Sequence, residues 1–321
     1  MKNLISILFL IVSLNAYSQF GPIPSGGGGS TLKNPPLNTY LPNGSVIGSY
    51  AAPSNDNFAF DGTNMWVTNN ASSGSALDTV LVFSATGKRV QTILLRVSSN
   101  PQGIAFDGTN MWVTCSGKNG VYKITNTYDT VFYSLGFYPV GIAFDGTNMW
   151  VVDLTNNGVS KISSTGTHTE YSLSGATDPR FIAFDGTYMW VTDDATTGVF
   201  RVASNGTSVF YDMTGSEVPY GVCYDGRYIW TANSSGNSVS RISQSGSIIT
   251  YSIGANTNPQ FVAYSGNYIY TSNLNNSTLT KITTSNGSVT SISAPSNIYY
   301  LFYDGSNMWL GGSRLYKMLV R

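Results

Sequence analysis

Few residues in this chain of 321 are suited to acid–base or nucleophilic chemistry. Its one histidine, His168, stands close to Glu170 in the polar segment Thr167 to Tyr171. A general base needs a pocket that holds a substrate against it, and the repeats described below put this pair on an outer rim. No nucleophile elbow, phosphate-binding loop or clustered metal-ligand motif is found. The sequence therefore predicts no catalytic residue.

Asp153 and Asp193 are the candidate metal ligands. Each follows an apolar strand-like run that begins Met-Trp, and Asp194 and Asp56 are further carboxylates that could join them. Carboxylate oxygens suit hard cations such as Ca²⁺ or Mg²⁺. We expect a divalent cation here only if these side chains converge, which depends on the elements that carry them.

Seven near-copies of one segment must position these residues. Four copies read FAFDGTNMWVTN, IAFDGTNMWVTC, IAFDGTNMWVVD and IAFDGTYMWVTD, and three drifted copies begin at Val222, Val262 and Leu301. The turn residue of each copy recurs about every 40 residues, at Asp61, Asp107, Asp145, Asp185, Asp225, Ser265 and Asp304. A repeat of this length built from short strands is typical of a β-propeller blade. The sequence therefore predicts an all-β, seven-bladed propeller of four-stranded antiparallel blades.

The fourth copy illustrates the expected blade. Short strands at 181–184, 189–192, 199–202 and 208–213 are joined by an Asp-Gly turn, where glycine tolerates positive φ, and by polar loops. We name these strands a to d from the axis outward. An aromatic ring recurs on strand b, and we expect it to pack between neighbouring blades. The rings belong to Trp66, Trp112, Trp150, Trp190, Trp230, Tyr270 and Trp309.

Strand c carries a cation in six of the copies. The residues are Lys123, Lys161, Arg201, Arg241, Lys281 and Lys317, and blade 1 has Val82 instead. The stem of each cation could cover a neighbouring residue, or its charge could pair with a turn aspartate. The sequence leaves both alternatives open.

The last copy lacks a fourth strand, and the N-terminal part of the chain supplies a replacement. Asn43-Gly-Ser-Val46 matches Asn286-Gly-Ser-Val289, which opens strand d of blade 6. We therefore predict that residues 44–51 form the outer strand of blade 7 and so remove exposed sheet edges. The propeller domain then covers residues 43–321.

Two sets of residues should meet on one face of the ring, because strand a begins and strand b ends there. The residues before strand a are Asp56, Gln102, Val140, Arg180, Tyr220, Gln260 and Tyr299. The residues after strand b are Asn69, Cys115, Asp153, Asp193, Asn233, Asn273 and Gly312. These positions vary while their neighbours repeat, which fits either ligand recognition or neutral drift of loops.

A ligand should bind at this channel mouth, because only at the axis can several blades surround one molecule. The predicted ligand-binding residues are Asp56, Gln102, Arg180, Tyr220, Gln260 and Tyr299. Tyrosine faces, amides and one guanidinium suit a sugar, another small molecule or a protein loop.

The first residues read as a secretory signal peptide. Lys2 precedes an apolar run from Leu4 to Leu14, and Ala16-Tyr-Ser18 offers a cleavage site. The run is too short to span a membrane as a helix. Residues 19–42, rich in Gly and Pro, are expected to be a flexible linker. The sequence thus predicts a secreted or periplasmic protein with no membrane span.

Charge and cysteine content exclude other classes of partner. Sixteen basic and sixteen acidic residues balance without a basic patch, so no nucleic-acid partner is expected. The two cysteines, Cys115 and Cys223, fall in blades 2 and 5, too far apart for a disulfide. We expect two buried free thiols.

The repeat resembles that of the virginiamycin B lyase-like propellers and of the related YVTN and NHL propellers. The shared unit is P-x-G-I-A-F-D-G-x-x-M-W-V-T-[ND] followed by N-G-V-x-K-I, and it is clearest at residues 101–124 and 139–162. The resemblance covers about residues 43–321 and implies the propeller fold. For the lyase family it implies metal-assisted ring opening of a streptogramin antibiotic, with a histidine and glutamate-rich metal ligands near the channel. This chain has no histidine predicted near the axis, and other residues follow strand b where that repeat commonly carries glutamate.

We therefore interpret the chain as a secreted or periplasmic binding scaffold with its ligand at the channel mouth. The alternative is a metal-dependent lyase or hydrolase that uses Ca²⁺ or Mg²⁺ held by the aspartates.

Overall fold

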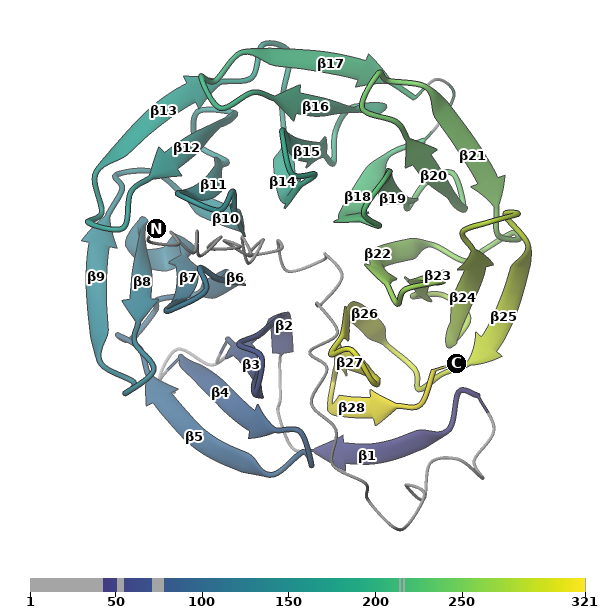
Figure 1. The fold of residues 1–321 in the computed structure, drawn as a ribbon, viewed down its shortest axis with the longest axis horizontal. Coiled ribbons are helices and arrows are strands. Elements are labelled where there is room, and N and C mark those ends of the chain that lie inside the picture. Colours follow the sequence, from purple (N-terminus) through teal and green to yellow (C-terminus); the bar gives the residue numbers. More distant parts are fainter. Residues whose placement is uncertain (1–42, 51–54, 71–77, 214, 216, 321) are drawn as a thin grey trace, which may run out of the picture.

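Seven four-stranded antiparallel sheets surround a central axis (Figure 1). The computed structural model describes residues 43–50, 55–70, 78–213, 215 and 217–320, of which 55 and 56 only by their backbone. The predicted seven-bladed propeller is confirmed. The predicted signal peptide and linker, residues 1–18 and 19–42, lie outside the described residues.

Each of the first six blades runs from the axis outward in chain order. Blade 1 comprises β2 (Asn55–Phe60), β3 (Asn64–Asn69), β4 (Thr79–Ser84) and β5 (Arg89–Leu94), and blade 2 comprises β6 (Pro101–Phe106), β7 (Met111–Cys115), β8 (Gly120–Ile124) and β9 (Thr130–Ser134). Blade 3 comprises β10 (Pro139–Phe144), β11 (Met149–Asp153), β12 (Gly158–Ile162) and β13 (His168–Ser172), and blade 4 comprises β14 (Pro179–Phe184), β15 (Met189–Asp193), β16 (Gly198–Val202) and β17 (Ser208–Asp212). Blade 5 comprises β18 (Pro219–Tyr224), β19 (Ile229–Asn233), β20 (Ser238–Ile242) and β21 (Ile248–Ser252), and blade 6 comprises β22 (Pro259–Tyr264), β23 (Tyr268–Asn273), β24 (Thr278–Thr283) and β25 (Val289–Ser293).

Blade 7 joins the two ends of the described chain. It comprises β26 (Ile298–Tyr303), β27 (Met308–Gly312), β28 (Leu315–Met318) and, as its outer strand, β1 (Val46–Tyr50). The pairing of β1 with β28 is antiparallel, with Tyr50 opposite Leu315, and Arg314 Nε donates to Ser49 Oγ across it at 2.9 Å. The predicted closure by the N-terminal strand agrees with this sheet.

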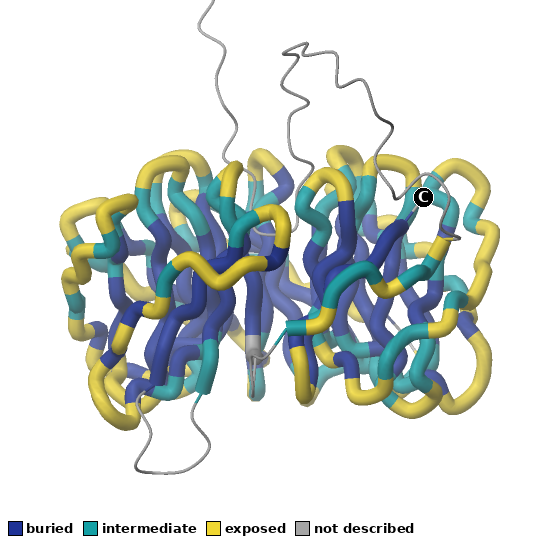
Figure 2. Tube along the Cα trace, turned by 90° about the horizontal axis from the view of Figure 1, so that it is seen from below, coloured by how far each residue is buried: buried dark blue, intermediate teal, exposed yellow. Residues whose placement is uncertain are grey.

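Burial is high on the three inner strands of each blade and low on the outer strand. Strands a, b and c are mostly buried, whereas strand d and the loops on both faces of the disc are exposed (Figure 2). Strand b is the most deeply buried, and in blades 2 to 5 all five of its residues are buried. The core is therefore a set of interfaces between blades rather than one central cluster.

The turn aspartate and the strand-b tryptophan form one hydrogen-bonded unit. In blade 4, Asp185 Oδ1 accepts hydrogen bonds from the backbone N–H groups of Thr187 and Tyr188, at 2.8 and 2.7 Å. Its Oδ2 accepts one from the indole Nε1 of Trp190, at 2.7 Å. The same indole bond, at 2.7 Å, occurs in five more blades. One carboxylate thus fixes the turn and satisfies the polar atom of a fully buried ring.

Blade 6 departs from this unit at both positions together. Ser265 replaces the aspartate and Tyr270 replaces the tryptophan, so neither the carboxylate nor the indole N–H is present. The ring of Tyr270 is still fully buried. The joint replacement indicates that aspartate and tryptophan act as a pair. The sequence predicted only that the rings pack between blades, and did not predict this hydrogen bond.

Neighbouring blades interlock through a tyrosine on strand d and a glycine in the next c–d turn. Tyr171 stacks on Trp150 of its own blade, with ring centroids 5.7 Å apart, and its ring also covers Gly206 of blade 4. A Cβ at Gly206 would overlap that ring, and its φ of +87° also favours glycine. Tyr50 on β1 repeats this arrangement, stacking on Trp309 at 5.9 Å and covering Gly87 of blade 1. The closing strand therefore fills the same interface as the strands made in sequence.

The interface between blades 1 and 2 reverses this arrangement. Ile93 stands on β5 where blades 2, 3, 4, 5 and 7 have the tyrosine and blade 6 has Ile292, and Tyr128 stands in the c–d turn where the next blades have glycine. Tyr128 has a φ of 69° and lies against Trp66, with ring centroids 5.7 Å apart. The large ring enters the interface from the opposite side, so the volume that it fills is preserved.

The strand-c cations reach the next blade. Lys123, Lys161 and Arg201 donate hydrogen bonds to the carbonyls of Ser164, Ser204 and Gln244, which lie in the following c–d turns. Of the two alternatives left by the sequence, pairing with a turn aspartate occurs in blade 7, where Lys317 Nζ lies 3.6 Å from Asp304 Oδ2. The usual role is therefore to tie adjacent blades together across the tryptophan ring.

The remaining expectations about the rim and the thiols agree with the structure. His168 lies on β13 at the rim, 3.6 Å from Glu170, and both cysteines are buried and unbridged.

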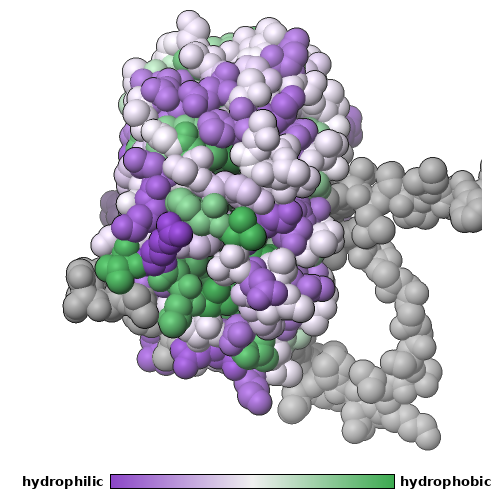
Figure 3. Space-filling view, turned by 90° about the vertical axis from the view of Figure 1, so that its left-hand side faces the viewer, coloured by the Kyte–Doolittle hydropathy of each residue, from purple (hydrophilic) through white to green (hydrophobic). Residues whose placement is uncertain are grey.

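The side of the disc that carries β5 and β9 has an apolar patch (Figure 3), and the exposed apolar residues of these strands include Val90, Leu94 and Val131. Within the described residues, no helix is long and apolar enough to cross a membrane.

Deletion of residues 44–51 should lower the melting temperature strongly, because it removes the partner of β28 and the Tyr50 ring from its interface with blade 1. Thermal unfolding of the deletion, compared with a deletion of the same length at 26–33 in the predicted linker, measures the effect. Equal melting temperatures for the two deletions would contradict the closure.

Asp185→Ala should destabilise the fold by about 2–4 kcal/mol, because it leaves the buried indole N–H and two turn N–H groups without an acceptor. Ser265→Ala in blade 6 is the matched control, since no indole depends on that side chain. Chemical denaturation of both variants gives the comparison, and similar losses would show that the indole bond adds nothing.

Candidate functional site

The channel mouth is built on an irregularity at the start of strand a. In blades 2 to 6 a proline opens the strand and pairs with the last residue of strand b, after which the register shifts by a bulge, as between Pro179 and Ile182 in blade 4. Bulges re-aim side chains and are frequent at the rims of closed sheets. The bulge contains the predicted ligand-binding residue and the residue after it, so both leave the regular alternation of the strand.

Hydroxyl groups of the preceding blade hold the backbone of several mouth residues. Thr192 Oγ1 donates to the carbonyl of Tyr220 at 2.6 Å, and Ser272 Oγ donates to that of Tyr299 at 2.7 Å. Thr68 Oγ1 bonds the carbonyl of Gln102 at 3.2 Å. The Thr or Ser of strand b thus couples the position of these three mouth residues to the blade before it.

Three of the predicted side chains are held by the residue two positions earlier. Gln102 Nε2 donates to Asn100 Oδ1 at 3.1 Å, and Gln260 Nε2 donates to Asn258 Oδ1 at 2.8 Å. In blade 4, Arg180 Nη2 donates to Asp178 Oδ2 at 2.9 Å. Sequence reasoning missed these supporting residues, although the triplets Asn-Pro-Gln and Asp-Pro-Arg carry the signal.

Aromatic rings from four blades form a floor beneath the mouth. Phe181 and Phe261 lie in edge contact with centroids 4.7 Å apart, and Phe261 meets Tyr300 at 4.5 Å. Tyr220 packs against Phe181 at 4.8 Å. Phe181 and Phe261 are 8% and 1% exposed, so a ligand at the mouth would rest on the Tyr220 and Tyr300 side of this cluster.

The bulges of blades 2, 3 and 5 carry glycine where blades 4, 6 and 7 carry these rings. A Cβ at Gly221 would lie 2.7 Å from the Cα of Phe261, which shows how closely the strands approach at the axis. The rings of blades 4 and 6 therefore depend on glycine in the blade before each of them, at Gly141 and Gly221.

The charges of the mouth gather in blade 4. Arg180 and Asp178 form an ion pair, in which Nε also lies 2.9 Å from Oδ1 but is poorly aligned for a hydrogen bond. Desolvation lowers the pKa of Arg180, but the hydrogen bond and charge of Asp178 outweigh it, and the pKa is raised. Burial, and then the negative charge of Asp178, raise the pKa of Asp194. Burial and the charge of Asp194 raise the pKa of Tyr220.

The two candidate metal ligands are occupied by hydrogen bonds within the protein. Asp153 accepts the backbone N–H groups of Thr155 and Asn156 at Oδ1 and the Asn156 amide at Oδ2. Asp193 accepts the backbone N–H groups of Thr177, Asp178 and Ala195. Each carboxylate is buried and fixes the loops of its own blade, and no group of three or more His, Cys, Asp or Glu residues forms a metal site within the described part of the chain.

The residues after strand b do not form a second ring around a ligand. Those that are fully or almost fully buried are Cys115, Asp153, Asp193, Asn233 and Asn273. Asn233 and Asn273 each donate to two hydroxyl groups of strand c, for example Asn233 to Ser238 and Ser240. Strand b ends inside the blade rather than at the mouth.

The predicted mouth residues are partly brought together. Arg180, Tyr220 and Gln260 are partly buried in adjacent blades, Gln102 is partly buried in blade 2, and Tyr299 is 42% exposed in blade 7. The side chain of Asp56 lies outside the described residues. Asp178 and Asp194 join the site as charged members, and neither stood among the predicted ligand-binding residues.

Comparison with solved structures shows the same fold in enzymes. Neither a protein-family model nor a curated protein matches the sequence. The chain superimposes on a catalytically inactive virginiamycin B lyase from Staphylococcus aureus with quinupristin, with a TM-score of 0.75, 19% identity, and 84% of this chain and 96% of that chain covered. A streptogramin B lyase gives 0.73, 19% identity, and coverage of 85% and 97%. Kuenenia stuttgartiensis hydrazine synthase gives 0.68, 16% identity, and coverage of 86% and 99%. At these identities the similarity concerns the fold.

Asp194→Asn should stabilise the protein at neutral pH. The pKa of Asp194 is raised in the folded state, so the folded protein binds the carboxyl proton more tightly than the unfolded chain does. The free energy of unfolding therefore falls as the pH rises from the ordinary aspartate pKa through the raised one. The gain should therefore shrink as the pH is lowered through the ordinary aspartate range. Melting temperatures of both proteins between pH 3 and 7 test this, and a gain that grows towards low pH would contradict it.

Proposed function

We propose that this protein is a secreted or periplasmic propeller that binds a small glycan at the channel mouth. The observation that carries the proposal is that Arg180, Gln102 and Gln260 are each held by the residue two positions earlier, and that Arg180 and Gln260 directly precede rings of the aromatic floor, Phe181 and Phe261. Side chains fixed in this way lose little freedom on binding, which favours recognition over a merely solvated surface.

The charges at the mouth favour a neutral, hydroxyl-rich ligand over an acidic one. The guanidinium of Arg180 already pairs with Asp178, and Asp194 adds a second carboxylate near them. An anion would meet this excess of negative charge, whereas sugar hydroxyls can donate to carboxylates and accept from amide and guanidinium groups. The bonds to Asn100 and Asn258 use Nε2 of Gln102 and Gln260 and leave each Oε1 as an acceptor.

Tyr299 offers the apolar face that such a ligand requires. The residue is 42% exposed, and its ring centroid lies 6.4 Å from that of Tyr300 at the edge of the floor. Aromatic rings with nearby polar groups are the usual lining of a small-molecule site. A protein loop offers the same kinds of group and is the competing ligand at this site.

The lyase alternative has one observation in its favour, the superposition on a virginiamycin B lyase. The candidate metal ligands do not favour this alternative, because Asp153 and Asp193 already accept three hydrogen bonds each. A hard cation would have to break these bonds and release the loops. The binding function therefore fits the side chains better.

Arg180→Ala and Tyr299→Ala should each weaken glycan binding at least tenfold, while His168→Ala on the rim should leave it unchanged. Tyr220→Phe keeps the ring packed on the floor and tests the hydroxyl alone. A glycan array identifies a saccharide, and calorimetry on the variants measures its affinity. Affinity lost in His168→Ala, or retained in both mouth variants, would move the site away from the axis.

A further inference from the structure

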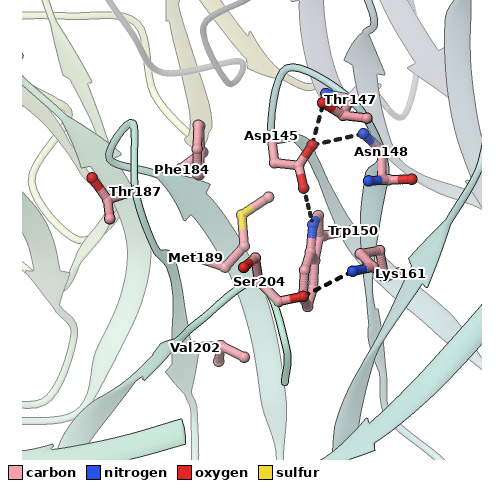
Figure 4. A pocket seen from close by; sticks show the side chains of 10 residues that line it. All are labelled: Asp145, Thr147, Asn148, Trp150, Lys161, Phe184, Thr187, Met189, Val202 and Ser204. Atoms are coloured by element: carbon pink, nitrogen blue, oxygen red, sulfur yellow. Dashed lines mark hydrogen bonds between the residues drawn. The ribbon is translucent and has the colours of Figure 1, made fainter. Parts of the chain in front are cut away.

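A pocket of about 280 Å³ opens between blades 3 and 4 on the face opposite the mouth (Figure 4). Blade 3 contributes Asn148, Trp150 and Lys161 to its wall, and blade 4 contributes Phe184 and Met189. Figure 4 shows Phe184 and Met189 across from the Trp150 ring, with Lys161 beyond that ring and bonded to Ser204 at 2.8 Å. The pocket thus combines an apolar wall with one ammonium group and one carboxylate, that of Asp145, whose oxygens accept hydrogen bonds from the Thr147 and Asn148 backbone and from the Trp150 indole.

The positive charge of Lys161 has fewer electron-rich groups around it than the charges of the equivalent cations in later blades. In blades 4, 5 and 6 a tyrosine ring lies under the cation, as for Arg201 over Tyr188 at 4.5 Å and Lys281 over Tyr268 at 3.6 Å. In blade 7 the carboxylate of Asp304 lies 3.6 Å from Lys317. Lys161 lies over Trp150 at 5.5 Å, and in the described part of the chain no carboxylate oxygen lies within 4 Å of its Nζ.

One sequence position distinguishes the blades in which a tyrosine ring fills this space. The residue two positions before the strand-b aromatic is tyrosine in blades 4, 5 and 6, at Tyr188, Tyr228 and Tyr268, and asparagine in the other blades. Two pockets open beside asparagines, the one at Asn148 and one of about 380 Å³ at Asn64 between blades 1 and 2. The smaller asparagine therefore leaves room that the tyrosine ring occupies elsewhere.

We propose that the pocket between blades 3 and 4 binds a small monocarboxylate that carries an apolar ring. The carboxylate accepts hydrogen bonds from the free N–H groups of Lys161 and from the Asn148 amide, in the place that Tyr188 takes in blade 4. The apolar ring packs against Phe184 and Met189. The charge assists these hydrogen bonds, and the apolar wall selects against acetate-sized anions.

The pocket between blades 1 and 2 provides an internal control. It has the same asparagine and tryptophan, Asn64 and Trp66, and the equivalent methionine, Met111. Its strand c carries Val82 at the position of the cation, so it lacks an ammonium group. An anion selected by Lys161 should bind beside Met189 and not beside Met111.

Phenylacetate and its neutral analogue phenylacetamide are suitable probes, with the ¹³C-labelled methionine methyl groups as reporters in NMR titrations. Met189→Leu and Met111→Leu assign the two signals. Phenylacetate should shift the Met189 signal saturably and bind at least tenfold more tightly than phenylacetamide, while the Met111 signal stays in place. Acetate should give no shift.

Three variants separate the contributions. Lys161→Met keeps the apolar stem on Trp150 and should weaken phenylacetate at least tenfold without affecting phenylacetamide. Asn148→Tyr fills the pocket as the chain itself does in three other blades, and should abolish binding with little change in melting temperature. Lys281→Met, where Tyr268 already fills the space, is the matched control and should bind as the unmodified protein does.

Equal affinity for phenylacetate and phenylacetamide would overturn the proposal, as would unchanged phenylacetate binding in Lys161→Met or a Met189 signal that does not respond. If Asn148→Tyr proved unstable, the comparison of charged and neutral probes and the Lys161→Met titration would still decide.

Discussion

The hydrogen bond between the turn aspartate and the strand-b indole is the interaction on which the ring depends. Trp190 is fully buried, and burial of its N–H without an acceptor would oppose the packing that its ring provides. Asp185 supplies the acceptor and, with its other oxygen, closes the a–b turn. Because the pair recurs in six blades, strands a and b are held at the same separation around the ring. The strand-c cation and the strand-d tyrosine then pack on the face of the positioned indole.

The backbone of the seven blades is a nearly constant frame, and residue changes at single positions alter the side chains that each blade exposes on the two faces of the disc. Tyrosine or asparagine before strand b fills or opens the space between blades, as at Tyr188 and Asn148. Glycine or phenylalanine in the bulge of strand a decides which blades extend a ring over the axis, as at Gly221 and Phe261. Both substitutions fall at the ends of strands, where the backbone is fixed by the frame and the side chain is not needed for it. A repeat protein can therefore acquire a site on either face without altering its core.

The sequence predicted the fold well because its signals are repeated seven times. The Asp-Gly turn and the match between Asn43 and Asn286 were enough for the blade count and for the closing strand. The site was predicted less well, because its features depend on contacts between blades. That Asp153 and Asp193 accept backbone N–H groups follows from the conformation of the neighbouring loops, which residue type does not specify. Likewise, most interfaces combine a strand-d tyrosine with a glycine in the next turn, whereas the interface of blades 1 and 2 combines Ile93 with Tyr128. This exchange is visible only once the two blades are placed side by side.

Blade 7 also sets the order in which the ring can form. Arg314 and Ser49, which bond across β28 and β1, are 265 residues apart in the chain. During synthesis from the N-terminus, β1 leaves the ribosome with an unpaired edge and must wait until almost the whole chain has followed. Each of the other blades can form from a continuous stretch of chain, so the contacts within it are local. The pairing of β1 with β28 instead joins residues with the highest sequence separation in the fold. The meeting of the two ends therefore closes the longest loop in the fold, and until it occurs the edges of β1 and β28 are open to pairing with other chains.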